Sequence, residues 1–275
     1  GGGNHFIEID IDDDGNKYLV IHTGSRNLGK QVAEYYQNLA IELCSGKEEM
    51  FAKREEIIRT YKEQGRKLEI QKALKKLEAE YRQYKPNLPN ELCYLEEKYR
   101  EMYLHDMKIC QKYASLNRLQ IAKMILIEYF TMTYISDMYP PIMQNSFETI
   151  HNYISFEDNI VRKGAISAKK GEKVLIPINM RDGSIIAIGK GNEDWNNSAP
   201  HGAGRIMSRN KAKEIFKLEE FKESMEGIYS TSIVEETIDE APFVYKPIQE
   251  IIDNIKDTVE IQKIIKPIYN FKAKN

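Results

Sequence analysis

The stretch "HFIEIDIDDDGNKYLVIH", residues 5–22, decides the fold because it holds two strand patterns joined by a turn signal. Residues 5–10 and 17–22 are rich in aromatic and β-branched side chains, which favour strands. The intervening "DDDGN" combines aspartate, glycine and asparagine, the residue types that tight turns favour. The stretch therefore predicts a β-hairpin.

A second strand pair and several helices are indicated further along the chain. "EKVLIPIN" (172–179) and "SIIAIG" (184–189) are predicted strands linked by the turn "MRDG". After the first hairpin, the loop "TGSRNLG" precedes apolar residues at i, i+3, i+4 and i+7 spacing, which indicates a helix. Helices are also predicted over residues 207–226 and 245–257, and "AIGKGNEDWNNSAPHGAG" is predicted to be a loop.

The middle of the chain has a different composition. Nineteen of the 38 residues at 47–84 are charged, which predicts a long exposed helix with ion pairs along its surface. "KPNLPN" at 85–90 ends that helix, and helical periodicity resumes over residues 91–137. We therefore expect an α+β fold with one domain over residues 1–275. It would combine a mixed β-sheet core and surrounding helices with a projecting helical hairpin inserted at about 47–137.

Composition bounds the class of protein. With 275 residues, of which 41% are hydrophobic, the chain can bury a sizeable core. Its three cysteines lack paired spacing, and no apolar run approaches the roughly 20 residues of a membrane span, so we expect a cytoplasmic protein with no membrane partner. The net charge of −2 is uninformative, but residues 159–213 hold eleven Lys and Arg against four Asp and Glu, which favours a locally basic surface.

Four of the five histidines share a setting, at or beside a predicted strand or helix end and next to Gly, Asn or Ser; these are His5, His22, His151 and His201. The fifth, His105, lies within a predicted helix. Neutral imidazole is the commonest metal ligand, and three histidines with a carboxylate or thiolate suit Mn, Zn or Fe. The spacing does not select which three, and each histidine singly also fits a hydrogen-bonded core or surface residue.

His201 differs from the others because it precedes Arg205, Arg209 and a predicted helix start, in "SAPHGAGRIMSR". Helix N-termini and arginine side chains bind anions. An imidazole beside a bound phosphate can act as a general acid or base, or as a nucleophile that forms a phosphoramidate. The alternative is a phosphate-binding loop whose histidine takes no part in chemistry.

Eight motifs occur in order along the chain: "GGGNHFIE", "IHTGSRNLG", "YLHDMKICQKYASLNR", "HNY", "RKGA", "SAPHGAGRIMSR", "DEAPFVYKPI" and "KPIYNFKA". In this order they resemble the RtcB family of GTP-dependent RNA-splicing ligases. The resemblance covers most of residues 1–275 and is weakest over residues 47–90.

The resemblance implies an enzyme that joins RNA ends bearing a 3'-phosphate or 2',3'-cyclic phosphate to 5'-hydroxyl ends, using GTP and two Mn²⁺ ions. His201 matches the histidine that attacks the GTP α-phosphate and carries GMP. The positions that match manganese ligands are His5, His22 and His151. The positions that match the guanylate pocket are Asn4, Glu8, Asn152, Ser184, Gly202, Ala203, Gly204, Tyr245 and Lys272. Phosphate or RNA would be bound by Arg26, Arg205 and Arg209.

Two departures from the family pattern are visible. Family members carry an upstream segment whose aspartate and cysteine complete the two-metal site, and none of the three cysteines here matches that motif. We therefore expect the chain to be the C-terminal majority of a longer, N-terminally complete catalytic domain. The pocket loop "PINMRDGS" keeps Pro177 and Ser184 but departs at Ile178 and Asn179, which indicates a divergent subfamily.

Two other functions remain open from the sequence. A truncated relative could bind RNA or nucleotide without ligating, or the same histidines could serve a metal-dependent phosphoesterase that acts on cyclic phosphates. The expected partners are GTP and RNA, either tRNA halves or broken RNA. The sequence leaves open the need for a helper protein and the oligomeric state.

Overall fold

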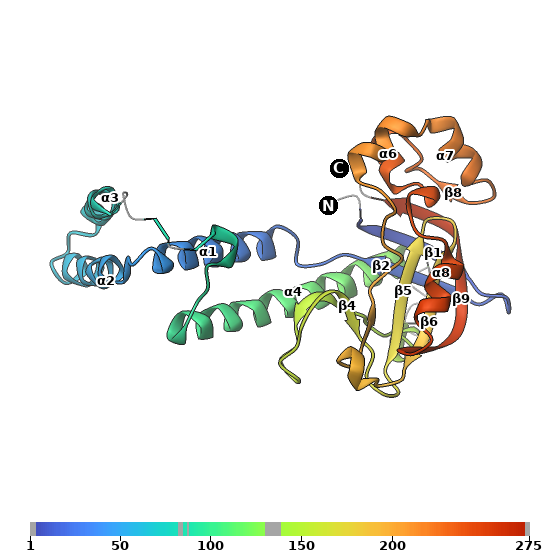
Figure 1. Ribbon diagram of the computed structural model, residues 1–275, viewed down its shortest axis with the longest axis horizontal. Coiled ribbons are helices and arrows are strands. Elements are labelled where there is room, and N and C mark those ends of the chain that lie inside the picture. The colour runs from blue at the N-terminus through green and yellow to red at the C-terminus, as the bar shows by residue number, and fades with distance from the viewer. Residues whose placement is uncertain (1–3, 82–84, 87, 130–138, 273–275) are drawn as a thin grey trace. The chain divides into compact units, whose positions relative to one another are not determined.

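The computed structural model describes residues 4–81, 85–86, 88–129 and 139–272. The chain forms two compact units: unit 1 comprises Gly1–Gly24 and Gln111–Asn275, and unit 2 comprises Ser25–Cys110. All of the strands described belong to unit 1, and helices occur in both units (Figure 1). The predicted α+β class is confirmed.

Unit 1 is built on a six-stranded sheet with the order β2-β1-β9-β6-β5 and β8 added beside β9. The strands are β1 (Phe6–Ile11), β2 (Lys17–His22), β5 (Lys173–Asn179), β6 (Gly183–Gly189), β8 (Tyr229–Ser230) and β9 (Val259–Lys272). Paired strands are antiparallel except β8 and β9, which are parallel. Both predicted hairpins, β1–β2 and β5–β6, are confirmed.

The longest strand, β9, has no counterpart among the predicted strands. It pairs with β1, β6 and β8 and so joins the two hairpins into one sheet. It contains Pro267, which has no N–H to donate to a ladder, and its alternation of buried and exposed residues breaks just after the proline, at Ile268 and Tyr269. The register against β1 shifts there, because Ile9 pairs with Tyr269 whereas Asp10 pairs with Pro267. A bulge thus accommodates the proline that weakens the strand pattern in the sequence.

A second sheet of three strands has the order β3-β4-β7, with β3 (His151–Ile154), β4 (Val161–Ser167) and β7 (Ser198–Pro200). β7 and the turn η3 (Glu193–Trp195) fall within the segment predicted to be a loop, which is therefore partly regular. The buried Arg162 of β4 fixes this segment: its Nε donates to Ser198 Oγ at 2.9 Å and its Nη2 to the Asn196 carbonyl at 3.2 Å. The chain that leads to His201 is anchored in this way.

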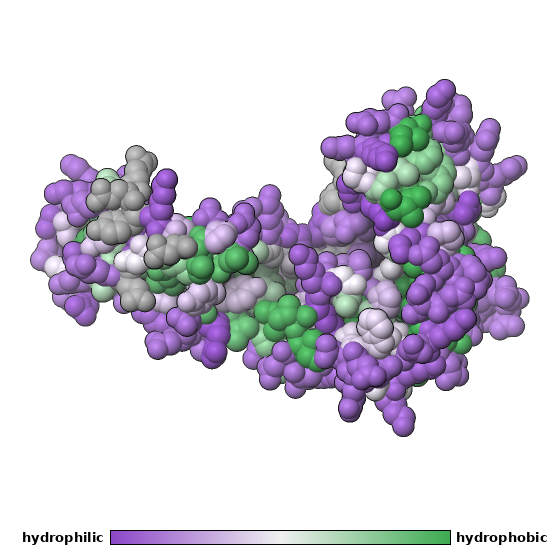
Figure 2. Space-filling view, viewed as in Figure 1, coloured by the Kyte–Doolittle hydropathy of each residue, from purple (hydrophilic) through white to green (hydrophobic). Residues whose placement is uncertain are grey.

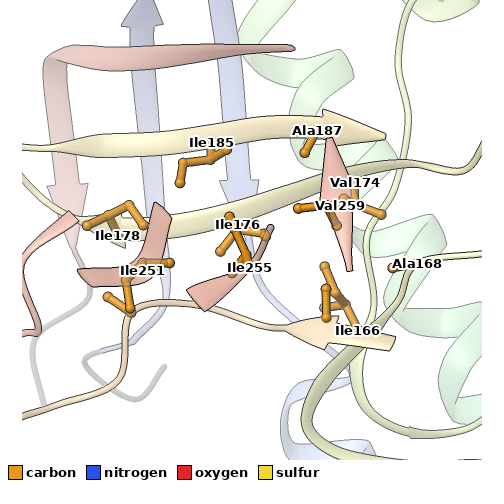
Figure 3. Packing of buried hydrophobic residues seen from close by; sticks show 12 residues of the cluster. Ile166, Ala168, Val174, Ile176, Ile178, Ile185, Ala187, Ile251, Ile255 and Val259 are labelled. Carbon is orange, nitrogen blue, oxygen red and sulfur yellow. The ribbon is translucent and has the colours of Figure 1, made fainter. Parts of the chain in front are cut away.

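The main core of unit 1 lies between the six-stranded sheet and helix α8 (Ile248–Asn254). Ile251 and Ile255 pack against Ile176 and Ile185, which point to this side of β5 and β6 (Figure 3). Pro247 precedes α8, and the helix is shorter than the predicted 245–257. Burial of this apolar cluster stabilises unit 1. Hydrophilic residues cover most of the face of unit 1 seen in Figure 2.

A smaller core lies under α6 (Arg209–Ile215), α7 (Leu218–Ser224), η4 (Glu235–Glu240) and η5 (Pro242–Val244). The sequence predicts one helix over 207–226, but the structure has two. Phe216 adopts extended backbone angles between them, and its ring lies 4.2 Å from that of Phe243 between centroids. The helix thus ends where the partly buried ring of Phe216 packs against η5.

Unit 2 is helical. Its elements are α1 (Arg26–Cys44), α2 (Glu48–Glu63), η1 (Lys67–Glu69), α3 (Ile70–Glu80) and η2 (Asn90–Leu92), and α4 (Glu97–Tyr129) contributes to both units. The single helix predicted over 47–84 is two helices, because Gly65 adopts a φ of +75° after α2. Within the described ranges, no helix combines the length and apolar character needed to cross a membrane.

Candidate functional site

A cavity of about 300 Å³ opens in unit 1 where the ends of several strands meet. The predicted site residues on its wall are Asn4, Glu8, His22, His151, His201, Gly202, Ala203, Gly204, Arg205, Arg209, Tyr245 and Lys272. Phe6 also lines it, and so do four residues of the predicted pocket loop "PINMRDGS": Pro177, Ile178, Asn179 and Gly183. Residues that are scattered along the sequence therefore share one cavity.

The register of the large sheet explains part of this convergence. Phe6 pairs with His22 on one side and with Lys272 on the other, so the three side chains come from one row of the sheet. Glu8 pairs with Asn270 in a neighbouring row, and the Asn270 amide donates to the Glu8 carboxylate. The predicted hairpin and the unpredicted strand β9 thus place an imidazole, an ammonium group and a carboxyl group together.

His22 and His151 form a close imidazole pair. Their Nε2 atoms are 3.1 Å apart and their rings meet edge to face. Burial, with a smaller effect from His151, lowers the pKa of His22 to about 3. Burial, followed by the charge of His201, also lowers the pKa of His151. Both rings are therefore neutral at pH 7, which is the form that binds a metal ion.

The imidazole pair fits two adjacent ligands of one divalent ion. Two nitrogens bound at about 2.1 Å lie about 3.0 Å apart when they subtend a right angle at the ion. His151 Nδ1 is buried and has no hydrogen-bond partner in the part of the chain that the structure describes. The ring centroid of His5 lies 6.2 Å from that of His22, and no three His, Cys, Asp or Glu side chains of the described residues form a ready metal site. His22 and His151 converge, whereas His5 stands farther off.

His201 is held in one tautomer by a backbone carbonyl. Its Nδ1 lies 2.7 Å from the Gly164 oxygen, and because a carbonyl can only accept, Nδ1 carries the proton. The neutral ring then has its lone pair on Nε2. Gly164 is itself held by Asn152, whose Oδ1 accepts the Gly164 N–H at 2.7 Å. The ring of His201 lies 4.8 Å from that of His151, so the nucleophile candidate adjoins the imidazole pair.

Four predicted residues lie off the cavity wall. His5 neighbours His22, and Asn152 acts through Gly164 as described. Ser184 is fully buried, and its hydroxyl has no hydrogen-bond partner among the described residues. Arg26 begins helix α1 in unit 2, so its assignment to phosphate or RNA binding stays a prediction.

Two acidic residues outside the predicted set, Asp239 and Glu240, are buried and pair with the cationic part of the cavity wall. Arg205 pairs with Glu240, and Arg209 Nη1 lies 2.5 Å from Asp239 Oδ2 and 2.8 Å from Glu240 Oε1. The predicted phosphate-binding arginines thus carry internal counter-charges. The signal was present in the sequence, since both acids open the motif "DEAPFVYKPI".

The helix that follows His201 is predicted to begin at residue 207 and begins two residues later. Helix α6 begins only at Arg209, with Ser208 as its capping residue, and it is seven residues long. His201 therefore belongs to the loop between β7 and α6. Anion binding near His201 has to come from the arginine side chains and from loop N–H groups, because the dipole of a short helix that starts farther along contributes little.

Glu8 and Asp10 are buried on one face of β1. Burial raises the pKa of Glu8 to about 7, against the opposing charge of Lys272 and the hydrogen bond from Asn270. Burial, assisted by the charge of Glu8, raises the pKa of Asp10 to about 9. Neither carboxylate oxygen of Asp10 has a hydrogen-bond partner among the described residues. A charged Asp10 would therefore destabilise unit 1.

We predict that Asp10→Asn stabilises the protein increasingly as pH rises. Folded Asp10 keeps its proton up to about pH 9, whereas the unfolded chain releases it near the ordinary value of 3.8. The free energy of unfolding of the unmodified chain should therefore fall between these two pH values, and the neutral amide removes that slope. The gain should be on the order of 1 kcal/mol or more between pH 5 and pH 8. Urea unfolding at several pH values measures it, and parallel pH profiles for the two proteins would contradict it.

Comparison with known proteins shows the family. The family model described as "tRNA-splicing ligase RtcB" matches residues 1–273. The chain is 30% identical over 275 residues to the "RNA-splicing ligase RtcB" of Escherichia coli (strain K12), which covers 95% of this chain and 57% of that protein. It is 26% identical over 318 residues to the "tRNA-splicing ligase RtcB" of Pyrobaculum aerophilum, covering 97% of this chain and 57% of the relative.

A third relative, the "tRNA-splicing ligase RtcB" of Nanoarchaeum equitans, is 27% identical over 320 residues, with 96% of this chain and 56% of the relative covered. The chain therefore spans little more than half the length of these curated relatives. The family match extends over nearly all of the chain and includes every wall residue of the cavity. The chain belongs to the tRNA-splicing ligase RtcB family.

Proposed function

We propose that the protein is an RNA ligase that joins 3'-phosphate or 2',3'-cyclic phosphate ends to 5'-hydroxyl ends through a GMP–histidine intermediate. The observation that carries the proposal is the fixed tautomer of His201, which leaves a lone pair on Nε2. The ring lies on the wall of a cavity that is also lined by the cationic side chains of Arg205, Arg209 and Lys272. The similarity to an RNA-splicing ligase and a tRNA-splicing ligase supports the reaction class.

His201 would act as the nucleophile in the first step. Its Nε2 forms a bond to the α-phosphorus of GTP, and the bond from that phosphorus to the β-phosphate bridge oxygen breaks, so pyrophosphate leaves with the bonding electrons. The ring becomes cationic as the P–N bond forms. The Gly164 carbonyl, which accepts the Nδ1–H, stabilises that charge and holds the ring in place.

A divalent ion, which we expect to be Mn²⁺, would neutralise phosphate charge and polarise phosphorus when bound. His22 and His151 would hold it through their facing Nε2 atoms, with His5 nearby. The buried, neutral state of the pair favours binding at pH 7 without loss of a proton from either ring. Arg205 and Arg209, which line the same cavity, would contact the phosphates.

RNA would approach over the basic segment 159–213. Several of its lysines are exposed: Lys163, Lys170, Lys173, Lys190 and Lys211. Contacts of such lysines with the phosphate backbone release counterions, so RNA affinity should fall steeply with salt. The substrate class we propose is RNA with broken or spliced ends, either tRNA halves or damaged RNA.

The direct test uses a 3'-phosphate RNA and a 5'-hydroxyl RNA incubated with the protein, GTP and Mn²⁺. A joined product that requires GTP supports the ligase. Binding of RNA and GTP with no joined product would instead indicate a binding module. Opening of a 2',3'-cyclic phosphate without GTP, and without joining, would indicate a phosphoesterase.

We predict that Asn152→Gly slows the covalent transfer of GMP about tenfold, because the Gly164 N–H loses its acceptor and the carbonyl that orients His201 becomes free to shift. Glycine tolerates the φ of +54° at this position, so the change tests the hydrogen bond and not backbone strain. Asn152→Asp keeps an acceptor and should lose less. Single-turnover labelling with α-labelled GTP gives both rates, and equal losses in the two variants would contradict the assignment.

A further inference from the structure

Glu240 is a fully buried carboxylate that does not touch the cavity and is surrounded by residues that do. One of its oxygens, Oε2, accepts from Lys272 Nζ at 2.8 Å and from the Tyr245 hydroxyl at 2.6 Å. The other, Oε1, accepts from Arg205 and lies 2.8 Å from Arg209 Nη1. All four donors line the cavity, and they come from three distant parts of the chain.

The exposed fractions show a layered arrangement of charge. The side chain of Glu240 is 0% exposed, that of Lys272 is 6%, that of Arg205 is 20% and that of Arg209 is 39%. The cations therefore stand between the buried carboxylate and the open cavity. Among the hydrogen bonds of the described residues, Arg209 uses only Nη1, so the remaining N–H groups of its guanidinium stay available to an anion.

We propose that Glu240 is the positioning residue of the nucleotide pocket, which holds Lys272, Tyr245, Arg205 and Arg209 in the geometry that receives the phosphates. This inference rests on the proposed binding of GTP. Because the four donor side chains are bound to the Glu240 carboxylate, each has fewer rotamers available. The conformational entropy of ordering these side chains is therefore lost when the protein folds and not when GTP binds.

The protonation state of Glu240 agrees with this role. Burial acts to raise its pKa, but the charge of Lys272 and the hydrogen bonds from Lys272 and Tyr245 outweigh burial and leave the pKa below its ordinary value. Glu240 is therefore ionised throughout the neutral range and accepts from all its neighbours. Asp239 supplements it by accepting from Arg209 and pairing with Lys213 at 3.3 Å.

The test compares the binding of GTP and of guanosine, measured by calorimetry in a Mn²⁺ buffer, in the unmodified chain, Glu240→Gln and Glu240→Asp. If Glu240 positions the phosphate-binding side chains, both variants should lose GTP affinity roughly ten- to a hundredfold. Their affinity for guanosine should change far less. A purely structural defect would lower both affinities alike. Glu236→Gln, at an exposed position of the same η4 turn, is the matched control and should change neither.

The direction of the effect separates two roles of the same carboxylate. If Glu240 only balanced charge, Glu240→Gln would make the pocket more positive and tighten GTP binding. Unchanged or tighter GTP binding, or an equal loss for guanosine, overturns the inference. If Glu240→Gln does not fold, Glu240→Asp and Tyr245→Phe, which keep the negative charge, carry the test. Failure of the unmodified chain to bind GTP would reject the proposed function itself.

Discussion

His201→Ala is expected to lower the covalent transfer of GMP from GTP to the protein at least about a thousandfold, because it removes the nucleophile of the proposed reaction. The ring projects from a loop, lines the cavity and is partly exposed, so its loss should leave the fold intact. Incubation with α-labelled GTP and Mn²⁺, followed by denaturing electrophoresis, measures the bound label.

Two controls accompany this prediction. His105→Ala removes an exposed imidazole of α4 and should label as the unmodified chain does. Equilibrium binding of GTP to His201→Ala should persist, because the arginines and Lys272 remain on the wall. Undiminished labelling of His201→Ala would mean that the cavity presents another nucleophile and that the proposed mechanism is wrong.

Gly183→Ala is expected to have the largest effect on stability, at least about 3 kcal/mol and severe enough to unfold much of unit 1. Gly183 begins β6 at a φ of +77°, and an added Cβ would lie 1.9 Å from the Ile265 carbonyl oxygen and 2.9 Å from its carbon. Both atoms belong to the backbone of β9, so the neighbour cannot rotate away. Relief requires β6 to move off β9, at the Ser184–Ile265 pair that sets their register.

Gly171→Ala is the matched control for the steric term. Its φ of +82° imposes a similar backbone strain, but a Cβ there would meet nothing within 4 Å. Gly171→Ala should therefore lower the free energy of unfolding by only about 1 kcal/mol. Urea unfolding followed by the fluorescence of Trp195, the single tryptophan and a residue of unit 1, measures both variants. Equal losses for the two glycines would show that the close packing of β6 on β9 is absent.

Local sequence patterns predict the parts of the fold that depend on neighbours in the chain. The turn signals "DDDGN" and "MRDG", each between two strand-forming runs, predict the β1–β2 and β5–β6 hairpins, because a tight turn fixes both the pairing and the register. β9 is different: it pairs with strands far away in sequence, and it contains a proline, Pro267, beside a bulge. The helix break at Phe216 likewise depends on tertiary packing, against Phe243. The break at Gly65 is local, because a glycine with a φ of +75° ends α2, and charge patterns alone do not report it.

The candidate site likewise has a part that the sequence predicts and a part that it does not. The setting of four histidines at strand ends predicts that they can converge, and the structure brings His22, His151 and His201 together. The role of Gly164 in fixing the His201 tautomer could not be predicted, and the motif "DEAPFVYKPI" contains the two buried acids without indicating that they pair with the arginines. They join residues separated by more than thirty positions, and no local pattern encodes such a pairing.

The central claim is that His201 Nε2 receives the nucleotide phosphorus. The most direct measurement is peptide mapping by mass spectrometry of the protein after reaction with GTP and Mn²⁺, under conditions that preserve a P–N bond. We predict one GMP adduct on the peptide that carries His201. An adduct on another residue, such as Lys272, or no adduct while RNA ends are still joined, would contradict the claim.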